Sequence, residues 1–206
     1  MADNVKVAVI YYSSTGTTHD MAVRLSQSAE KAGADVRLRK VTELAPDEVI
    51  ASVPEWARHR EETHDVEIAT PDDVVWADVV LLGSPTRFGN VASQLKQFID
   101  LLGPQWGQGL LADKVYAGFT SSKTEHGGQE STLLALYNTI HHFGGLIVSP
   151  GYTDPVKFED GNPYGVGHVT GPNGDVELES TSLNALDHMA ERAVEVAGKL
   201  KSGNAA

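Results

Sequence analysis

The sequence contains no cysteine among its 206 residues. Disulfide bonds, thiolate catalysis and cysteine-ligated iron–sulfur clusters are therefore excluded. No apolar run approaches the roughly 20 residues that a membrane-spanning helix needs. The N-terminal MADNVKVAVIYY also lacks the basic segment and long apolar stretch of a secretory signal. We therefore predict a cytoplasmic protein that makes no membrane contact.

Positive charge is scarce. The chain has 16 Lys and Arg against 28 Asp and Glu, for a formal net charge of −12. A nucleic-acid-binding protein normally presents a basic face, so we predict no nucleic-acid partner. The remaining composition, 41% hydrophobic and 21% charged, is ordinary for a globular protein. The length suits one domain with a sizeable core, and we expect residues 1–206 to form a single domain.

Two nucleotide-binding motifs are also missing. No Gly-Lys-Ser/Thr occurs, which excludes a P-loop, and no GxGxxG follows the first apolar segment, which argues against a Rossmann-type NAD site. That segment leads instead into SSTGTT, in which Gly16 is the one residue without a hydroxyl. Backbone amides at a helix start, with hydroxyl donors and a glycine, make a phosphate site without a cation. The alternative is a helix cap with incidental hydroxyls, but a cap needs only one.

Apolar segments of two periods alternate along the chain. Runs typical of strands cover 5–12, 35–41, 79–82, 114–120 and 146–148, and apolar stripes at helical spacing cover 22–32, 91–102, 133–140 and 183–200. Alternating strands and helices predict an α/β fold, a doubly wound parallel sheet with helices on both faces. Residues 43–75 and 150–178 fit no such unit, and we expect them to be long loops.

Two further loops would lie at the carboxyl ends of the strands, where open α/β sheets bind ligands. One is GSPTRFGN, residues 83–90, and the other is SSKTEHGGQE, residues 121–130. Taken alone, each is as consistent with a structural turn as with a site. His59 and His64 lie among acidic residues, but their spacing matches no familiar ligand motif. We interpret that segment as a solvated charged loop and predict no metal.

Together these loops, in the order YYS and hydroxyl turn, GSPTRFGN, TSS…HGGQE and HHFGG, resemble those of flavodoxin-like FMN proteins. Within that group the chain resembles the WrbA-type NAD(P)H:quinone oxidoreductases from Val5 to about Leu200. PTRFGN and HGGQE are the most specific pieces. The resemblance implies a flavodoxin-like five-stranded sheet of order 2-1-3-4-5, bound FMN, and a homotetramer whose active sites use more than one chain.

The resemblance also implies the residues of the site. The FMN phosphate would lie on Ser13, Ser14, Thr15, Gly16, Thr17 and Thr18, and the flavin ring would be bordered by Pro85, Thr86, Arg87, Phe88, Gly89 and Asn90. The other ring edge would face Ser121, Ser122, Thr124 and Gly127, with His142 reaching the pocket. Trp106 and Phe88, together with His142, would contact the substrate. Alternatively, His142 is a helix-end histidine and Trp106 a surface or interface packing residue. The chain differs from the family pattern at Thr15, where some relatives carry an aromatic residue, and at Lys123, Glu125 and His126.

The implied activity is two-electron reduction of a quinone by NAD(P)H in a ping-pong sequence of hydride transfers. Two alternatives remain open on the sequence. One is a flavodoxin-type electron carrier, whose acidity would suit basic protein partners. The other is a binding or scaffold protein that has kept the fold without the flavin.

Overall fold

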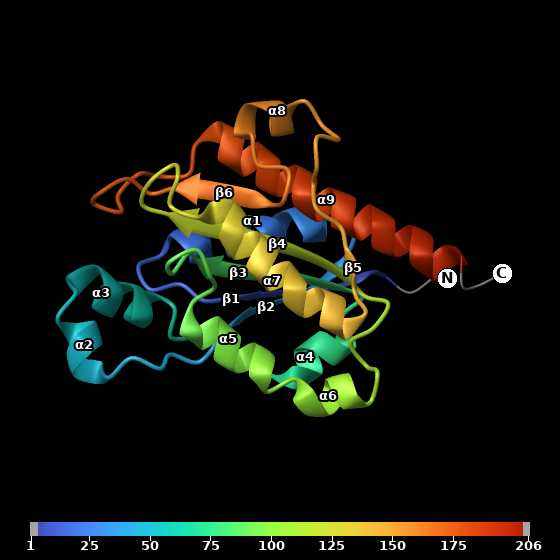
Figure 1. The fold of residues 1–206 in the computed structure, drawn as a ribbon, viewed down its shortest axis with the longest axis horizontal. Helices are drawn as coiled ribbons and strands as arrows, with labels where there is room; N and C mark the ends of the chain where they lie inside the picture. Colours follow the sequence, from blue (N-terminus) through green and yellow to red (C-terminus); the bar gives the residue numbers. More distant parts are fainter. Residues whose placement is uncertain (1–3, 204–206) are drawn as a thin grey trace.

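The computed structural model describes residues 4–203 and contains one parallel β-sheet (Figure 1). Five strands follow the order β2-β1-β3-β4-β5, which confirms the predicted strand order, and a sixth strand, β6, also pairs with β4. The strands are β1 (Lys6–Tyr11), β2 (Asp35–Lys40), β3 (Val79–Pro85), β4 (Val115–Ser122), β5 (Leu146–Ile147) and β6 (Val166–Val169).

The central strands are apolar because the sheet is covered on both faces. Every residue of β3 and β4 is buried, and so is β1 apart from its first residue. The edge strand β2 is only partly buried, which matches its alternation of apolar and charged residues. Near-continuous apolar runs are what a parallel sheet between two helical layers requires.

Helices form the two outer layers, as predicted (Figure 1). Apolar residues of α1 and α9 pack on one face of the sheet, and those of α4, α5 and α7 pack on the other. The helices are α1 (Thr17–Lys31), α2 (Asp47–Ala51), α3 (Pro54–Glu62), α4 (Pro71–Trp76), α5 (Ser93–Asp100), α6 (Gly103–Gly107), α7 (Gln129–Phe143), α8 (Val156–Asp160) and α9 (Ser180–Gly203). None of the helices within residues 4–203 combines the length and apolar character needed to cross a bilayer.

Two short strands, β5 and β6, share the position beside β4 where we predicted a single fifth strand. β4 pairs with β5 at Val115 and Tyr116, and with β6 from Phe119 to Ser122. The intervening segment leaves the sheet and forms α8. Pro150 and Pro155 lie in this segment and have no N–H for a strand ladder, which accounts for the interruption. The expected loop at 150–178 therefore contains a helix and a strand.

The expected loop at 43–75 is also wrong in detail, because it contains α2, α3 and α4. Pro54 and Pro71, interpreted as turn signals, are the first residues of α3 and α4. Proline is favoured there because the first helical N–H has no intrahelical partner. Thr70 and Asp73 add a capping box at the start of α4. The three short helices lie between β2 and β3, with α2 and α3 beyond the carboxyl ends of the strands (Figure 1).

Candidate functional site

The loops that follow β1, β3 and β4 meet at the carboxyl edge of the sheet. The hydroxyls of Thr18 and Ser121 lie 3.2 Å apart, joining the first loop to the third. Arg87 Nη2 lies 3.3 Å from the Ser14 hydroxyl, which joins the second loop to the first. The backbone N–H of Thr86 donates to the Ser121 carbonyl at 2.8 Å. Three segments far apart in the sequence thus form one surface.

The first loop presents backbone amides at the start of α1. Gly16 precedes the helix with φ 116°, a conformation that disfavours any side chain. Its N–H donates to the Ser13 hydroxyl at 3.1 Å. Within the described part of the chain, no side chain caps the first turn of α1. The first amides of the helix are therefore available to an anion, which the helix dipole also favours.

The second loop turns sharply after the buried Pro85. Arg87 N–H donates to the Asn90 carbonyl at 2.7 Å, and Gly89 N–H donates to the Thr86 hydroxyl at 3.2 Å. Phe88 has φ 53° and is fully exposed. A positive φ is uncommon for an aromatic residue, and here it holds the ring out from the loop. The ring is available to cover a flat ligand.

Part of the third loop is held in place by hydrogen bonds to its own residues and to α7. The Ser122 hydroxyl accepts from Gln129 Nε2 at 2.8 Å and donates to the Thr124 carbonyl at 2.7 Å. A Cβ atom on Gly127 would lie 2.8 Å from Ser122 Cβ, so the turn requires glycine there. Ser121 is buried, whereas the side chain of Thr124 is exposed. The Ser122 hydroxyl is therefore already used by its own loop and α7, whereas the Ser121 hydroxyl lies beside Thr18 of the first loop.

Trp106 and His142 lie elsewhere, near the amino ends of the strands. Trp106 Nε1 donates to the His142 carbonyl at 2.7 Å, and both side chains are exposed. His142 is near the end of α7, which starts at the carboxyl edge and runs back for 15 residues. At 1.5 Å per residue, that helix separates His142 from the three loops by about 20 Å. Figure 1 shows α6 and the end of α7 away from the loops that follow β1, β3 and β4. Within one chain, the structure therefore does not bring Trp106 and His142 to the other predicted site residues.

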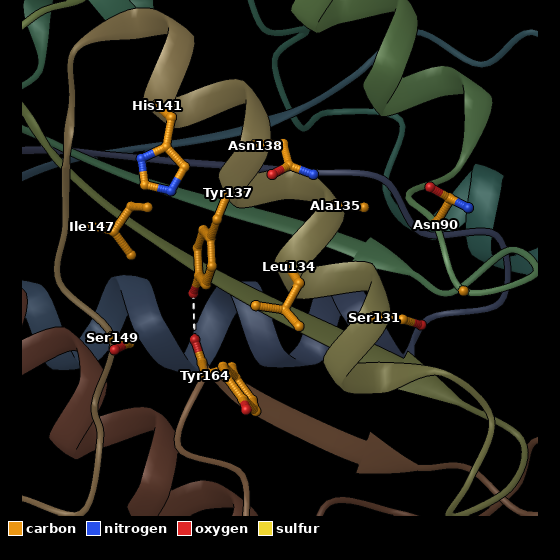
Figure 2. A pocket seen from close by; sticks show the side chains of 11 residues that line it. Asn90, Ser131, Leu134, Ala135, Tyr137, Asn138, His141, Ile147, Ser149 and Tyr164 are labelled. Atoms are coloured by element: carbon orange, nitrogen blue, oxygen red, sulfur yellow. Dashed lines mark hydrogen bonds between the residues drawn. The ribbon is translucent and has the colours of Figure 1, made fainter.

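A groove of about 580 Å³ follows the outer face of α7 between the two ends of the sheet. It begins at Gly89 and Asn90 in the second loop and reaches His141 and Ile147. Figure 2 shows Asn90, Ser131, Leu134 and Asn138 along this path, with the hydroxyl of Tyr137 donating to the Tyr164 carbonyl. The groove joins the carboxyl-edge loops to the end of α7 that carries His142.

A buried histidine lies beside the first loop, although the sequence indicated a solvated segment there. His59 of α3 is 6% exposed, and its ring stacks at a tilt on His19 of α1 with 5.4 Å between centroids. His19 Nδ1 lies 2.5 Å from the Tyr11 hydroxyl. Burial, followed by the charges of His19, Lys40 and Arg58, lowers the pKa of His59 to about 4. Burial also lowers the pKa of His19.

The family model described as NADPH-dependent FMN reductase matches residues 5–153. The chain belongs to this family. It is similar to a Deinococcus radiodurans protein named NAD(P)H dehydrogenase (quinone), with 45% identity covering 97% of this chain and 99% of that protein. A Rhizobium rhizogenes protein of the same name is 38% identical, covering 95% and 98%. The structure is similar to that of the flavodoxin, WrbA-like protein from Agrobacterium tumefaciens, with TM-score 0.67, 25% identity, and coverage of 95% and 99%.

In this member of the FMN reductase family, sequence reasoning also missed a carboxylate that fixes the wall beside the first loop. Glu43 accepts hydrogen bonds from the Tyr12 hydroxyl (2.9 Å), Trp56 Nε1 (3.1 Å) and Gln94 Nε2 (2.7 Å). Burial raises its pKa, but hydrogen bonds from the Ala45 amide and the Gln94 and Tyr12 side chains outweigh burial, and the net pKa is lowered. No single segment carries this network, so no sequence motif could have indicated it.

Proposed function

We propose that this protein is an FMN-dependent NAD(P)H:quinone oxidoreductase. The proposal is supported by full-length relatives named for that activity and by the FMN reductase family model. In the overall reaction NAD(P)H gives up a hydride, which supplies two electrons and one proton, and a second proton comes from solvent, so that the quinone becomes a hydroquinone. The observation on which the proposal depends is the uncapped, hydroxyl-bearing start of α1, joined by hydrogen bonds to the loops after β3 and β4.

The residues present fit FMN. Its terminal phosphate needs several donors in a small space, and the Gly16 turn offers uncapped amides with hydroxyls beside them. Its ring needs a flat, partly apolar border, which the turn around Phe88 provides. We assign the phosphate to Ser13, Ser14, Thr15, Gly16, Thr17 and Thr18, and the ring edges to Pro85, Thr86, Arg87, Phe88, Gly89, Asn90, Ser121, Ser122, Thr124 and Gly127.

When bound, FMN would supply the hydride-transfer chemistry that no amino-acid side chain offers. The protein would bind and orient the flavin and its two substrates in turn, which gives ping-pong kinetics. Phe88 would pack against a flat substrate. No side chain of the three loops needs to act as a strong acid or base. The proposed location is the cytoplasm, where NAD(P)H is at hand.

A homotetramer forms the second part of the proposal. Trp106 and His142 lie at the edge of the sheet opposite the three loops, so they can approach a bound flavin only from another chain. Both side chains are exposed, and the groove along α7 leads between the two ends. In the proposed assembly, the Trp106 of one protomer packs beside the substrate on another, and His142 donates a hydrogen bond there.

The test is a steady-state assay of FMN-loaded protein with NADH or NADPH and benzoquinone. We expect NAD(P)H oxidation that depends on both FMN and quinone, with parallel double-reciprocal plots. Protein that binds FMN but oxidises neither nucleotide would support the alternative of a flavodoxin-type electron carrier. Protein that binds no FMN would contradict both. Size-exclusion chromatography with light scattering would test the tetramer independently of activity.

A further inference from the structure

A buried imidazole faces the turn that we assign to the phosphate. A Cβ atom added to Gly16 would have one neighbouring atom within 4 Å, namely His59 Nδ1 at 3.8 Å. His59 is 6% exposed, and among the hydrogen bonds of residues 4–203 its ring nitrogens have no partner. The ring nitrogens are not among the fully buried side-chain atoms that lack a partner in the described residues, so the ring is open to the cavity beside the first loop.

The charged and titratable groups around His59 come from β1, α1, β2 and α3 and from the segments that follow β1 and β2. A cavity of about 190 Å³ lies between α3 and the first loop and gives the imidazole a route to solvent. Ser13 of the first loop and His59 both line this cavity. The titratable residues that line the same cavity are Tyr11, Tyr12, Lys40, Glu43 and Arg60. The charges of His19, Lys40 and Arg58 act on the His59 ring, and those of Asp20 and Glu62 act on the neighbouring His19.

These surroundings keep His59 neutral when no anion is near. Burial is the largest cause, and the charges of His19, Lys40 and Arg58 act in the same direction on its pKa. A phosphate monoester at the start of α1 would reverse the balance, because a dianion close to the ring favours the imidazolium. The hydroxyl loop itself carries no cation between Lys6 and Arg24. Arg87 reaches the Ser14 hydroxyl from the second loop, and His59, whose Nδ1 lies 3.8 Å from a Cβ atom built on Gly16, is a further group that can supply a positive charge beside the turn.

We propose that His59 is a phosphate-binding residue that takes up one proton from solvent when the FMN phosphate enters residues 13–18. The neutral imidazole becomes an imidazolium whose N–H groups donate to the phosphate or its surroundings. The inference rests on the proposed assignment of the FMN phosphate to that loop. It adds a residue from α3, a segment that the sequence patterns did not connect with flavin binding.

The test is isothermal titration calorimetry of the full-length, flavin-free protein with FMN and with riboflavin, which lacks the phosphate. Titrations at pH 7.5 in two buffers of different ionisation enthalpy give the number of protons taken up. His59→Gln removes the titrating group and retains a hydrogen-bonding side chain. His64→Gln is the matched control, because His64 lies on the same segment with a side chain that is 64% exposed.

For the wild type and His64→Gln, we expect uptake of close to one proton per FMN and none with riboflavin. His59→Gln should lose that uptake, and its FMN affinity should fall about ten- to a hundredfold, as expected for loss of a charge-assisted hydrogen bond. Its riboflavin affinity should change less than twofold. FMN binding to the wild type without proton uptake, or equal uptake in His59→Gln, would overturn the inference while leaving the proposed function intact. Absence of FMN binding to the wild type would overturn the proposed function instead.

A second measurement does not depend on the folding of a variant. In the wild type, FMN affinity should decline as pH rises through the pKa of His59 in the complex, because the imidazolium is then lost. Between pH 7.5 and 9 the phosphate is already a dianion, so its own ionisation contributes little there. Riboflavin affinity should stay flat over the same interval. An FMN affinity that is equally flat would contradict the inference.

Discussion

The two ends of the β-sheet carry candidate site residues of different kinds. At the carboxyl ends, three loops are joined by hydrogen bonds such as Thr18 to Ser121 and Arg87 to Ser14. At the amino ends, Trp106 and His142 contact one another but lie exposed on the surface. The first group needs only the chain's own topology, because parallel strands deliver their following loops to one edge. The second group needs a neighbouring chain before it can meet the first.

Unusual backbone conformations occur at both edges of the sheet. The carboxyl edge holds backbone in conformations that only some residues accept, at Gly16, Phe88 and Gly128. Such positions persist where the surrounding structure enforces them, and they are frequent at ligand sites. At the amino edge, Gly109, Asp113 and Gly144 also have positive φ, and Gly144 ends α7 in the way common to many helices. Because the three loops lie at the carboxyl edge and Trp106 and His142 at the amino edge, we expect substitutions at the first to act on flavin binding and those at the second to act on turnover.

The largest effect should come from Gly16→Val. The φ of 116° is strained for any residue with a Cβ atom, and relief of that strain would move the amides away from the phosphate. We expect FMN affinity to fall by about a hundredfold or more, since several charge-assisted hydrogen bonds would be lost. Fluorescence titration of flavin-free protein with FMN measures the change.

Gly33→Val is the matched control for that prediction. Gly33 lies just beyond the other end of α1 with φ 87°, and nothing lies within 4 Å of its added Cβ atom. Both variants should lose thermal stability from backbone strain, but only Gly16→Val should lose FMN. Equal flavin affinity in the two variants would remove the first loop from the site.

A smaller effect should come from Trp106→Ala, which leaves the carboxyl edge intact. We expect FMN to be retained while kcat/KM for the quinone falls about three- to tenfold, the range of a lost aromatic contact. If the Trp106 of one protomer serves another, mixing Trp106→Ala with Gly16→Val should restore activity above the sum of the two. Flavin-binding loops would then come from one variant and tryptophans from the other.

The control for the mixing experiment is a double variant, Gly16→Val with Trp106→Ala. Mixed with Trp106→Ala, it can supply neither a flavin nor a tryptophan, so activity should not rise above that of Trp106→Ala alone. Equal activity in the two mixtures would mean that Trp106 does not act across chains.

The strand order and the first loop could be predicted from sequence because each depends on local signals. Apolar, β-branched runs such as VAVIY are typical of buried parallel strands, and SSTGTT begins two residues after the end of that run. The division of the fifth strand was not foreseen, because β5 has two residues and β6 lies some 20 positions later. The three helices within 43–75 were missed since their prolines signal turns and helix starts equally well.

The contribution of α3 to the site could not be predicted for a different reason. His59 lies in a segment whose neighbours are nearly all charged, and sequence alone indicates exposure there. Its burial depends on the packing of α3 beside the first loop. Trp56 of α3 donates a hydrogen bond from Nε1 to the Glu43 carboxylate there. Contacts of this kind depend on tertiary packing and have no period or motif in the chain.

The smallest effect should come from Arg87→Gln, which tests whether the bond between the first and second loops matters. Arg87 Nη2 lies 3.3 Å from the Ser14 hydroxyl, and Arg87 is exposed. Exposed interactions of this type contribute little, so we expect FMN affinity to fall only about two- to fivefold. Lys96→Gln is the matched control, because it removes the same charge from the exposed pair with Asp100 on α5. If Arg87→Gln weakened FMN binding as much as Gly16→Val, the carboxyl edge would depend on its side chains and not on its backbone, and the contrast between the two ends of the sheet would have to be redrawn.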